Sequence, residues 1–324
     1  MPQFILHVGS GKTGTSYIQA ALSLNEKLLA RHNIYYPRSP KHDIAVSGGI
    51  TGGNGQRIAN ILNGKIFIGA RRDALGVDAE EAVSSAEGKD ILFSAESMQF
   101  LTEEGLIQLK KSIEQAGYVA RVIIYVRDVA DAAYSSYNQD VKRGGFSGTF
   151  TEFLSKYYLI FARTIRIVND VLGADAVDVR NYNRKKAILL EDFRAALGLS
   201  VSLRAPPQSV INRSLDLDEL VLMREFNKRI GSLGVASRVS DAIIYGAPDV
   251  NPRVLITGAD VELMRHKFSA DVAYVNSFLP ADQCISVGQA IASASDSEKQ
   301  VPEVSQRERA LISIISMLLT RQRV

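Results

Sequence analysis

A short loop near the N-terminus carries the first residues that could do chemistry. It reads GKTGTS, from Gly11 to Ser16, and follows the apolar run ILHV at residues 5–8. Glycines let backbone amides approach an anion, and a helix that starts here directs its N–H groups and positive dipole end at it. Lys12 adds a full charge, and hydroxyl groups come from Thr13, Thr15 and Ser16. The loop is therefore predicted to bind a phosphate or sulfate group.

The spacing of this loop differs from that of the common nucleoside-triphosphate loop. The pattern GxxxxGK[ST] needs a glycine five residues before Gly11, and Leu6 stands there. A kinase would also need an acidic residue at a strand end to hold Mg²⁺. Asp128 is the nearest candidate, and we interpret it as a helix cap instead. The sequence therefore shows no convincing second acidic residue at a strand end for Mg²⁺.

A second constellation lies in IIYVRDVADAAYSSYNQ, residues 123–139. Arg127 ends an apolar run, and Ser135 follows eight residues later, two turns into a predicted helix. One helix face can bring the hydroxyl beside the guanidinium, and the pair would form a receptor for a second phosphate. An arginine at a strand end is as often part of a structural ion pair, here with Asp128 or Asp131.

Together the two motifs resemble those of the sulfotransferases that use 3′-phosphoadenosine-5′-phosphosulfate (PAPS). The KTGT form of the loop is common among bacterial members, and its match implies that the 5′-phosphosulfate is held by Gly11, Lys12, Thr13, Gly14, Thr15 and Ser16. Arg127 and Ser135 match the family's 3′-phosphate pair in type, spacing and order. Tyr182 in RNYNR matches a tyrosine near the adenine, although Asn183 stands where an acidic residue is usual. The resemblance covers roughly residues 3–200, and INRSL at 211–215 is a weaker match to the family's motifs.

The resemblance implies an enzyme that moves a sulfuryl group from PAPS to an acceptor hydroxyl or amine and releases adenosine 3′,5′-bisphosphate (PAP). It also implies that no metal ion is needed. Lys12 would stabilise charge on the leaving phosphate. Two residues are candidates for the base that takes the acceptor's proton: Glu96 in FSAES and His42 in PRSPKHD. Glu96 is favoured. Bacterial members favour a carbohydrate or lipid-linked acceptor by analogy. A nucleotide-dependent kinase and a non-catalytic nucleotide-binding module are the alternatives.

The elements that must position these residues alternate along the first part of the chain. Apolar strands are predicted at 4–8, 33–36, 91–93, 122–126 and 177–179, and helices at 13–31, 102–117, 129–143 and 185–197. Apolar strands separated by helices favour an α/β fold, a P-loop-like parallel sheet covered by helices on both faces. Lys12, Glu96 and Arg127 each follow a strand, and ligands of such sheets bind at the carboxyl ends of the strands.

The pattern becomes helical after residue 200. Helices are predicted at 215–230, 260–278 and 310–319, with a linker at 290–300 and a capping box formed by Ser305 and Glu308. We expect residues 1–200 to form the PAPS-binding core and residues 201–324 to form a helical part packed on it.

Net charge, cysteine content and the length of apolar segments limit which partners and compartments we expect. A net charge of +3 over 324 residues gives no reason to expect nucleic acid, and the single Cys284 fits a reducing compartment. The most apolar late stretch, ALISIISMLL, falls well short of the ~20 residues needed to cross a bilayer. No signal peptide precedes the first strand. We expect a cytoplasmic enzyme with a small-molecule or glycan acceptor, and the sequence leaves its oligomeric state open.

Overall fold

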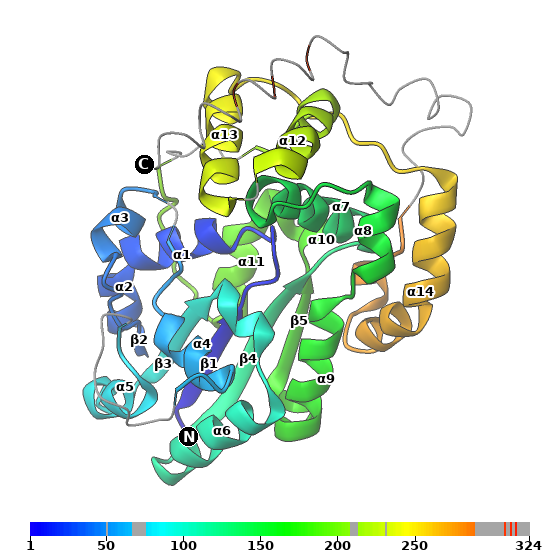
Figure 1. The fold of residues 1–324 in the computed structure, drawn as a ribbon. Coiled ribbons are helices and arrows are strands. Elements are labelled where there is room, and N and C mark those ends of the chain that lie inside the picture. Colours follow the sequence, from blue (N-terminus) through cyan, green and yellow to red (C-terminus); the bar gives the residue numbers. More distant parts are fainter. Residues whose placement is uncertain are drawn as a thin grey trace. The chain divides into compact units, whose positions relative to one another are not determined.

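In a computed structural model of the protein, the chain forms two compact units (Figure 1). The residues that the structure describes are 1–49, 51–66, 76–207, 213–230, 232–288, 308, 312 and 315. The first unit comprises Met1–Arg127, Leu159–Val210 and Ala270–Ser286, and the second Asp128–Tyr158, Ile211–Ser269 and Val287–Val324. The units interleave along the chain, whereas the expected division at residue 200 is sequential and stays a prediction. The predicted linker, capping box and last helix lie almost wholly outside the described residues.

The first unit is built on a five-stranded parallel sheet. Its strands are β1 (Gln3–Val8), β2 (Ile34–Tyr35), β3 (Asp90–Ala95), β4 (Val119–Val126) and β5 (Val177–Asn181). They lie in the order β2-β3-β1-β4-β5, and every neighbouring pair is parallel. The register places Val8 opposite both Ala95 and Ile124, so β1, β3 and β4 end at the same edge. The predicted α/β class and its five strands are confirmed.

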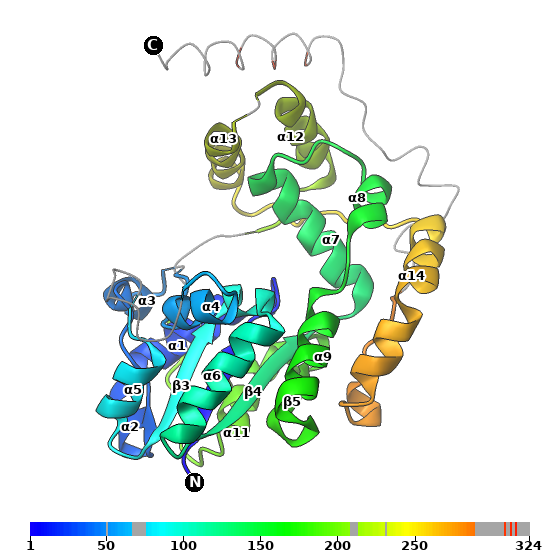
Figure 2. The same cartoon turned by 60° about the horizontal axis from the view of Figure 1, so that its bottom comes forward.

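Helices cover both faces of this sheet (Figure 2). One face carries α1 (Thr15–Leu24), α2 (Glu26–Arg31) and α11 (Leu189–Ala196), and the other α4 (Gln56–Leu62), α5 (Ala79–Ala86), α6 (Glu103–Gln115) and α9 (Ile160–Leu172). On the first face Ile5 and Ile123 of the strands pack with Ile18, Leu22 and Phe193 of the helices. Burial of each such side chain contributes about 1.5 to 3 kcal/mol. This packing fixes where α1 begins relative to the end of β1.

The predicted helix at 13–31 is two helices, because the chain breaks at Asn25. The Asn25 amide donates to the carbonyls of Ala21, at 2.7 Å, and Arg204, at 2.9 Å, and it accepts a hydrogen bond from the Arg204 backbone N–H. The break therefore binds a segment that is distant in the sequence, which no local helix pattern reveals.

The second unit is helical in its described part. It contains α7 (Val129–Gln139), α8 (Phe150–Lys156), α12 (Leu217–Ile230), α13 (Leu233–Gly246) and the beginning of α14 (Gly258–Asn276). The predicted helix after Arg127 is confirmed, and it ends in a π-helical turn at Asp140–Gly144. Asp128 lies at the N-cap position of α7 but makes no side-chain capping hydrogen bond, so its interpretation as a cap was wrong in that respect. Within the described residues, no helix is both long enough and apolar enough to cross a membrane.

Candidate active site

The loop between β1 and α1 has a constrained backbone. Lys12 and Gly14 both adopt left-handed conformations, with φ of 62° and 75°, and Gly14 is the N-cap of α1. A Cβ atom on Gly9 would lie 2.4 Å from the Thr15 hydroxyl oxygen, so this position admits glycine alone. A non-glycine residue in the left-handed region costs about 1 to 3 kcal/mol, and such strain clusters at ligand sites.

The hydroxyl groups of the loop are not equivalent. Thr13 is fully buried and donates its hydroxyl to the Ser10 carbonyl at 2.7 Å, so it stabilises the turn itself. Thr15 is also buried, and its Oγ1 has no hydrogen-bond partner among the residues that the structure describes. Ser16 is half-buried in the first turn of α1, whose N–H groups have no partner within the helix. Thr15, Ser16 and the start of α1 therefore fit a bound anion, while Thr13 supports the loop from within.

Glu96 lies beside this loop. It directly follows β3 as the first residue of the 3₁₀ helix η1 (Glu96–Phe100), and a Cβ atom on Gly11 would lie 3.7 Å from its Oε1. Although the side chain reaches the surface, desolvation by the surrounding protein raises the pKa of its carboxyl group, and the positive charge of Lys12 opposes this rise. A carboxylate with a raised pKa beside a lysine is suited to accept a proton.

Arg127 and Tyr182 approach the loop from the other side. The Nη1 of Arg127, at the end of β4, donates to the Lys12 carbonyl at 3.0 Å. The guanidinium carbon lies 5.4 Å from the ring centroid of Tyr182, the first residue of α10 (Tyr182–Lys185). Burial raises the pKa of the Tyr182 phenol, and the charge of Arg127 acts against it. The structure thus brings together Lys12, Glu96, Arg127 and Tyr182.

The contacts just described do not include two of the predicted residues. Ser135 is half-buried in α7 of the second unit, so its pairing with Arg127 stays a prediction. His42 begins α3 (His42–Val46), where its Nε2 lies 3.4 Å from Oε2 of Glu26. That carboxylate also accepts a hydrogen bond from Arg38 at 2.7 Å. The carboxylate observed beside His42 thus belongs to α2.

Asn54 is a residue near the site that sequence reasoning missed. Strand β2 pairs with β3 only at Asp90 and Ile91, so the edge of β3 beyond these residues needs other hydrogen-bond partners. The buried Asn54 side chain donates to the carbonyls of Pro37 and Leu92, both at 3.0 Å, and accepts from the Ser94 N–H at 2.8 Å. One side-chain amide replaces the missing strand, two residues before Glu96.

The glycines around Asn54 make this approach possible. A Cβ atom on Gly53 would lie 2.0 Å from the Ser94 carbonyl oxygen, and one on Gly55 would lie 2.2 Å from the Met98 side chain. Gly53 also has a φ of 79°, in the left-handed region. The cluster GGNG at residues 52–55 is thus the signal in the sequence that marks close contact with the end of β3.

Replacing Asn54 with alanine should lower the free energy of unfolding by about 2 to 4 kcal/mol, because three buried backbone groups lose their partner. Chemical denaturation followed by circular dichroism measures this loss. Asn63→Ala is the matched control, since the side chain of the half-buried Asn63 donates one hydrogen bond to the described residues, to the Ser97 carbonyl at 3.2 Å. Equal losses in the two variants would show that Asn54 does not hold the edge of β3.

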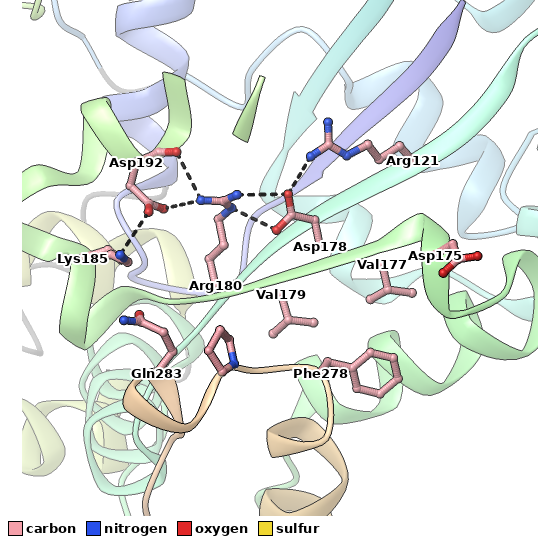
Figure 3. A pocket seen from close by; sticks show the side chains of 11 residues that line it. Arg121, Asp175, Val177, Asp178, Val179, Arg180, Lys185, Asp192, Phe278 and Gln283 are labelled. Carbon is pink, nitrogen blue, oxygen red and sulfur yellow. Dashed lines mark hydrogen bonds and ion pairs between the residues drawn. The ribbon is translucent and has the colours of Figure 1, made fainter. Parts of the chain in front are cut away.

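A cavity of about 450 Å³ lies at the β5 edge of the sheet and includes none of the predicted site residues (Figure 3). Arg180 lies between Asp178, at 3.0 Å, and Asp192, at 3.1 Å. Arg121 pairs with Asp178 at 2.7 Å, and Lys185 with Asp192 at 3.6 Å. Because these cations have carboxylate partners within the cavity wall, we interpret the network as a structural link between β4, β5 and α11. No group of three or more potential metal ligands was found among the described residues.

Comparison with known proteins adds one distant likeness. No protein-family model matches the sequence, and no curated protein matches it. Among solved structures, the chain is similar to a sulfotransferase from Alicyclobacillus acidocaldarius, with 16% sequence identity and a TM-score of 0.45. The alignment covers 86% of this chain and 96% of that one. At this distance the likeness bears neither on a substrate nor on the residues of the site.

Proposed function

We propose that the protein is a sulfotransferase that moves a sulfuryl group from PAPS to an acceptor hydroxyl or amine and releases PAP. The observation that carries this proposal is the convergence of Lys12, Glu96 and Arg127 on one anion-binding loop at the carboxyl ends of β1, β3 and β4. The choice of PAPS as donor is supported by the resemblance of the GKTGTS and Arg127–Ser135 motifs to those of that family.

The chain's own residues fall into groups around such a donor. The 5′-phosphosulfate would be held by the first N–H groups of α1 together with Lys12, Thr15 and Ser16, because these combine charge, an unpartnered buried hydroxyl and a helix N-terminus. Arg127 and Ser135 would hold the 3′-phosphate, and Tyr182 would lie beside the adenine. No metal ion is needed in this arrangement.

The chemistry follows from where charge develops. The acceptor attacks sulfur in line, and the bond between sulfur and the 5′-phosphate oxygen breaks. Negative charge then accumulates on the leaving phosphate, where Lys12 and the backbone amides of the loop stabilise it. Because these groups are already oriented, they need little rearrangement at the moment of reaction.

The proton of the acceptor goes to Glu96 in this proposal. Glu96 lies beside Gly11. The pKa of its carboxyl group is raised, and a base works best when its pKa lies near the working pH. The rival base, His42, lies beside Glu26 of α2, with its Nε2 3.4 Å from the Glu26 carboxylate. Glu96 also follows a strand directly, and catalytic groups work best on rigid elements.

The acceptor is proposed to be a carbohydrate or a lipid-linked molecule, by analogy with bacterial KTGT members. The segment at 38–56 would form part of its binding surface, since Asn54 attaches this segment to the end of β3 beside Glu96.

Titration calorimetry with PAP, AMP and ATP·Mg²⁺ tests the proposal. PAP should bind about ten- to a hundredfold more tightly than AMP, because each charge-assisted hydrogen bond to the 3′-phosphate contributes roughly 1.5 to 3 kcal/mol. Equal affinity for PAP and AMP would contradict the assignment of a second anion position. Tighter binding of ATP·Mg²⁺ than of PAP would favour a phosphoryl transferase, and PAP binding without any turnover of PAPS would favour a binding module.

A further inference from the structure

The conformation of Lys12 needs support from outside the loop. Among the described residues, three that are not glycine have a positive φ: Lys12, Asn33 and Glu87. Asn33 is of a type that tolerates this region, and Glu87 is the C-cap of a helix, where left-handed residues are common. Lys12 has neither explanation, because it lies between β1 and α1 in the middle of the proposed anion site.

Arg127 supplies such support. Its Nη1 donates to the carbonyl oxygen of Lys12 at 3.0 Å, which joins the end of β4 to the loop across 115 positions of sequence. The guanidinium is half-buried, and a hydrogen bond from a charged donor is stronger than one between neutral groups. The bond orients the peptide group that follows the strained residue, and hence the N–H of Thr13 at the entrance to α1.

Tyr182 completes the support at the second left-handed residue. The Tyr182 ring lies under the guanidinium of Arg127, and a Cβ atom on Gly14 would lie 3.2 Å from its Cε2. Leu189 is closer still to the same position, at 2.4 Å. Gly14 therefore lies against the helices that follow β5. Arg127 contacts the loop at Lys12, and Tyr182 contacts it at Gly14.

We infer that Arg127 and Tyr182 are positioning residues that hold the anion-binding loop in its working conformation, in addition to their proposed contacts with the nucleotide. The inference rests on the proposed function for the identity of the ligand. The inference predicts an effect that would be absent if the 5′-phosphate and 3′-phosphate sites were independent. Loss of Arg127 should weaken ligands that carry no 3′-phosphate, because the loop that binds their 5′ phosphates loses its support.

Calorimetry with pyrophosphate, AMP and PAP on Arg127→Met distinguishes the two cases. We expect the affinity for pyrophosphate and AMP to fall about tenfold, which lies within the usual range of coupling between sites. The affinity for PAP should fall further, because it also loses a direct contact. Unchanged affinity for pyrophosphate and AMP, with a loss confined to PAP, would overturn the inference and leave the proposed function intact.

Arg121→Met is the matched control, because Arg121 lies on β4, the strand that Arg127 directly follows. Arg121 pairs with Asp178, and in the variant Asp178 keeps its other partner, Arg180, at 3.0 Å. The variant should leave the affinity for all three ligands unchanged.

A second pair of variants tests the Tyr182 ring independently of Arg127. Tyr182→Phe should bind pyrophosphate like the unaltered protein, whereas Tyr182→Ala should bind it more weakly. Equal binding by both variants would remove Tyr182 from the inference.

Amide hydrogen exchange gives a readout that needs no ligand. Peptides covering residues 9–17 should exchange about tenfold faster in Arg127→Met than in Arg121→Met, since a loop without its support opens more often. Equal exchange in the two variants would overturn the inference even if the unaltered protein bound no anion. Absence of PAP binding to the unaltered protein would count against the proposed function alone.

Discussion

Replacing Lys12 with methionine is expected to reduce sulfuryl transfer by on the order of 10³-fold or more while the fold persists. The variant keeps the length of the side chain and removes the charge that stabilises the leaving phosphate, an interaction made mainly in the transition state. The half-buried Lys12 side chain contributes little to packing, so the thermal unfolding midpoint should change by only a few degrees. Release of PAP from PAPS, with water standing in for the acceptor, measures the loss.

The control for this experiment is Lys111→Met, which removes an exposed lysine of α6. It should release PAP at the rate of the unaltered protein. If Lys12→Met kept most of its turnover, the glycine loop would be a structural turn and the proposed chemistry would lose its main cation.

Replacing Glu96 with glutamine should slow the chemical step by about 10² to 10⁴, the usual contribution of general base catalysis. The amide keeps the size of the side chain and most of its hydrogen bonding, so the affinity for PAP should not fall. His42→Asn should have a smaller effect, because the Nε2 of His42 lies beside the carboxylate of Glu26 in α2. Single-turnover rates with a transferable acceptor measure the step. A larger loss in His42→Asn would assign the base to the segment at 38–56.

The pH profile separates a base from a residue that merely shapes the site. Desolvation raises the pKa of Glu96, and Lys12 only partly opposes this effect. A base must be deprotonated, so kcat should fall as the pH drops through this raised pKa, above the range of an ordinary glutamate. Glu96→Gln should lack this acidic limb. A limb that persists unchanged in Glu96→Gln would belong to another group.

Much of the site could be predicted because its residues follow strand ends. Apolar runs before Lys12, Glu96 and Arg127 predicted strands, and alternation with helices predicted a parallel sheet. Carboxyl ends of neighbouring parallel strands meet at one edge, so three residues distant in sequence were expected near one another. The structure places β1 between β3 and β4, and that order brings Glu96 and Arg127 to the same loop.

Details that depend on distant partners could not be read from local patterns. Thr13 and Thr15 are chemically identical, yet the Thr13 hydroxyl bonds to Ser10 while the Thr15 hydroxyl lies buried beside Gly9. The break at Asn25 exists because its amide binds Arg204, 179 positions away. These hydrogen-bond partners depend on which groups lie close together in the folded chain, and side-chain type alone does not predict them.

The sequence by itself determined that a glycine-rich loop with Lys12 follows the first strand of an α/β sheet. Periodicity and glycine positions express local backbone preferences, and these are enough to place strands, turns and helix starts. Only the tertiary structure decided that Arg127 donates a hydrogen bond to the Lys12 carbonyl and that Asn54 replaces a strand beside β3. Both depend on hydrogen bonds between chain segments far apart in sequence, because a buried carbonyl or N–H must find a partner wherever the packing provides one.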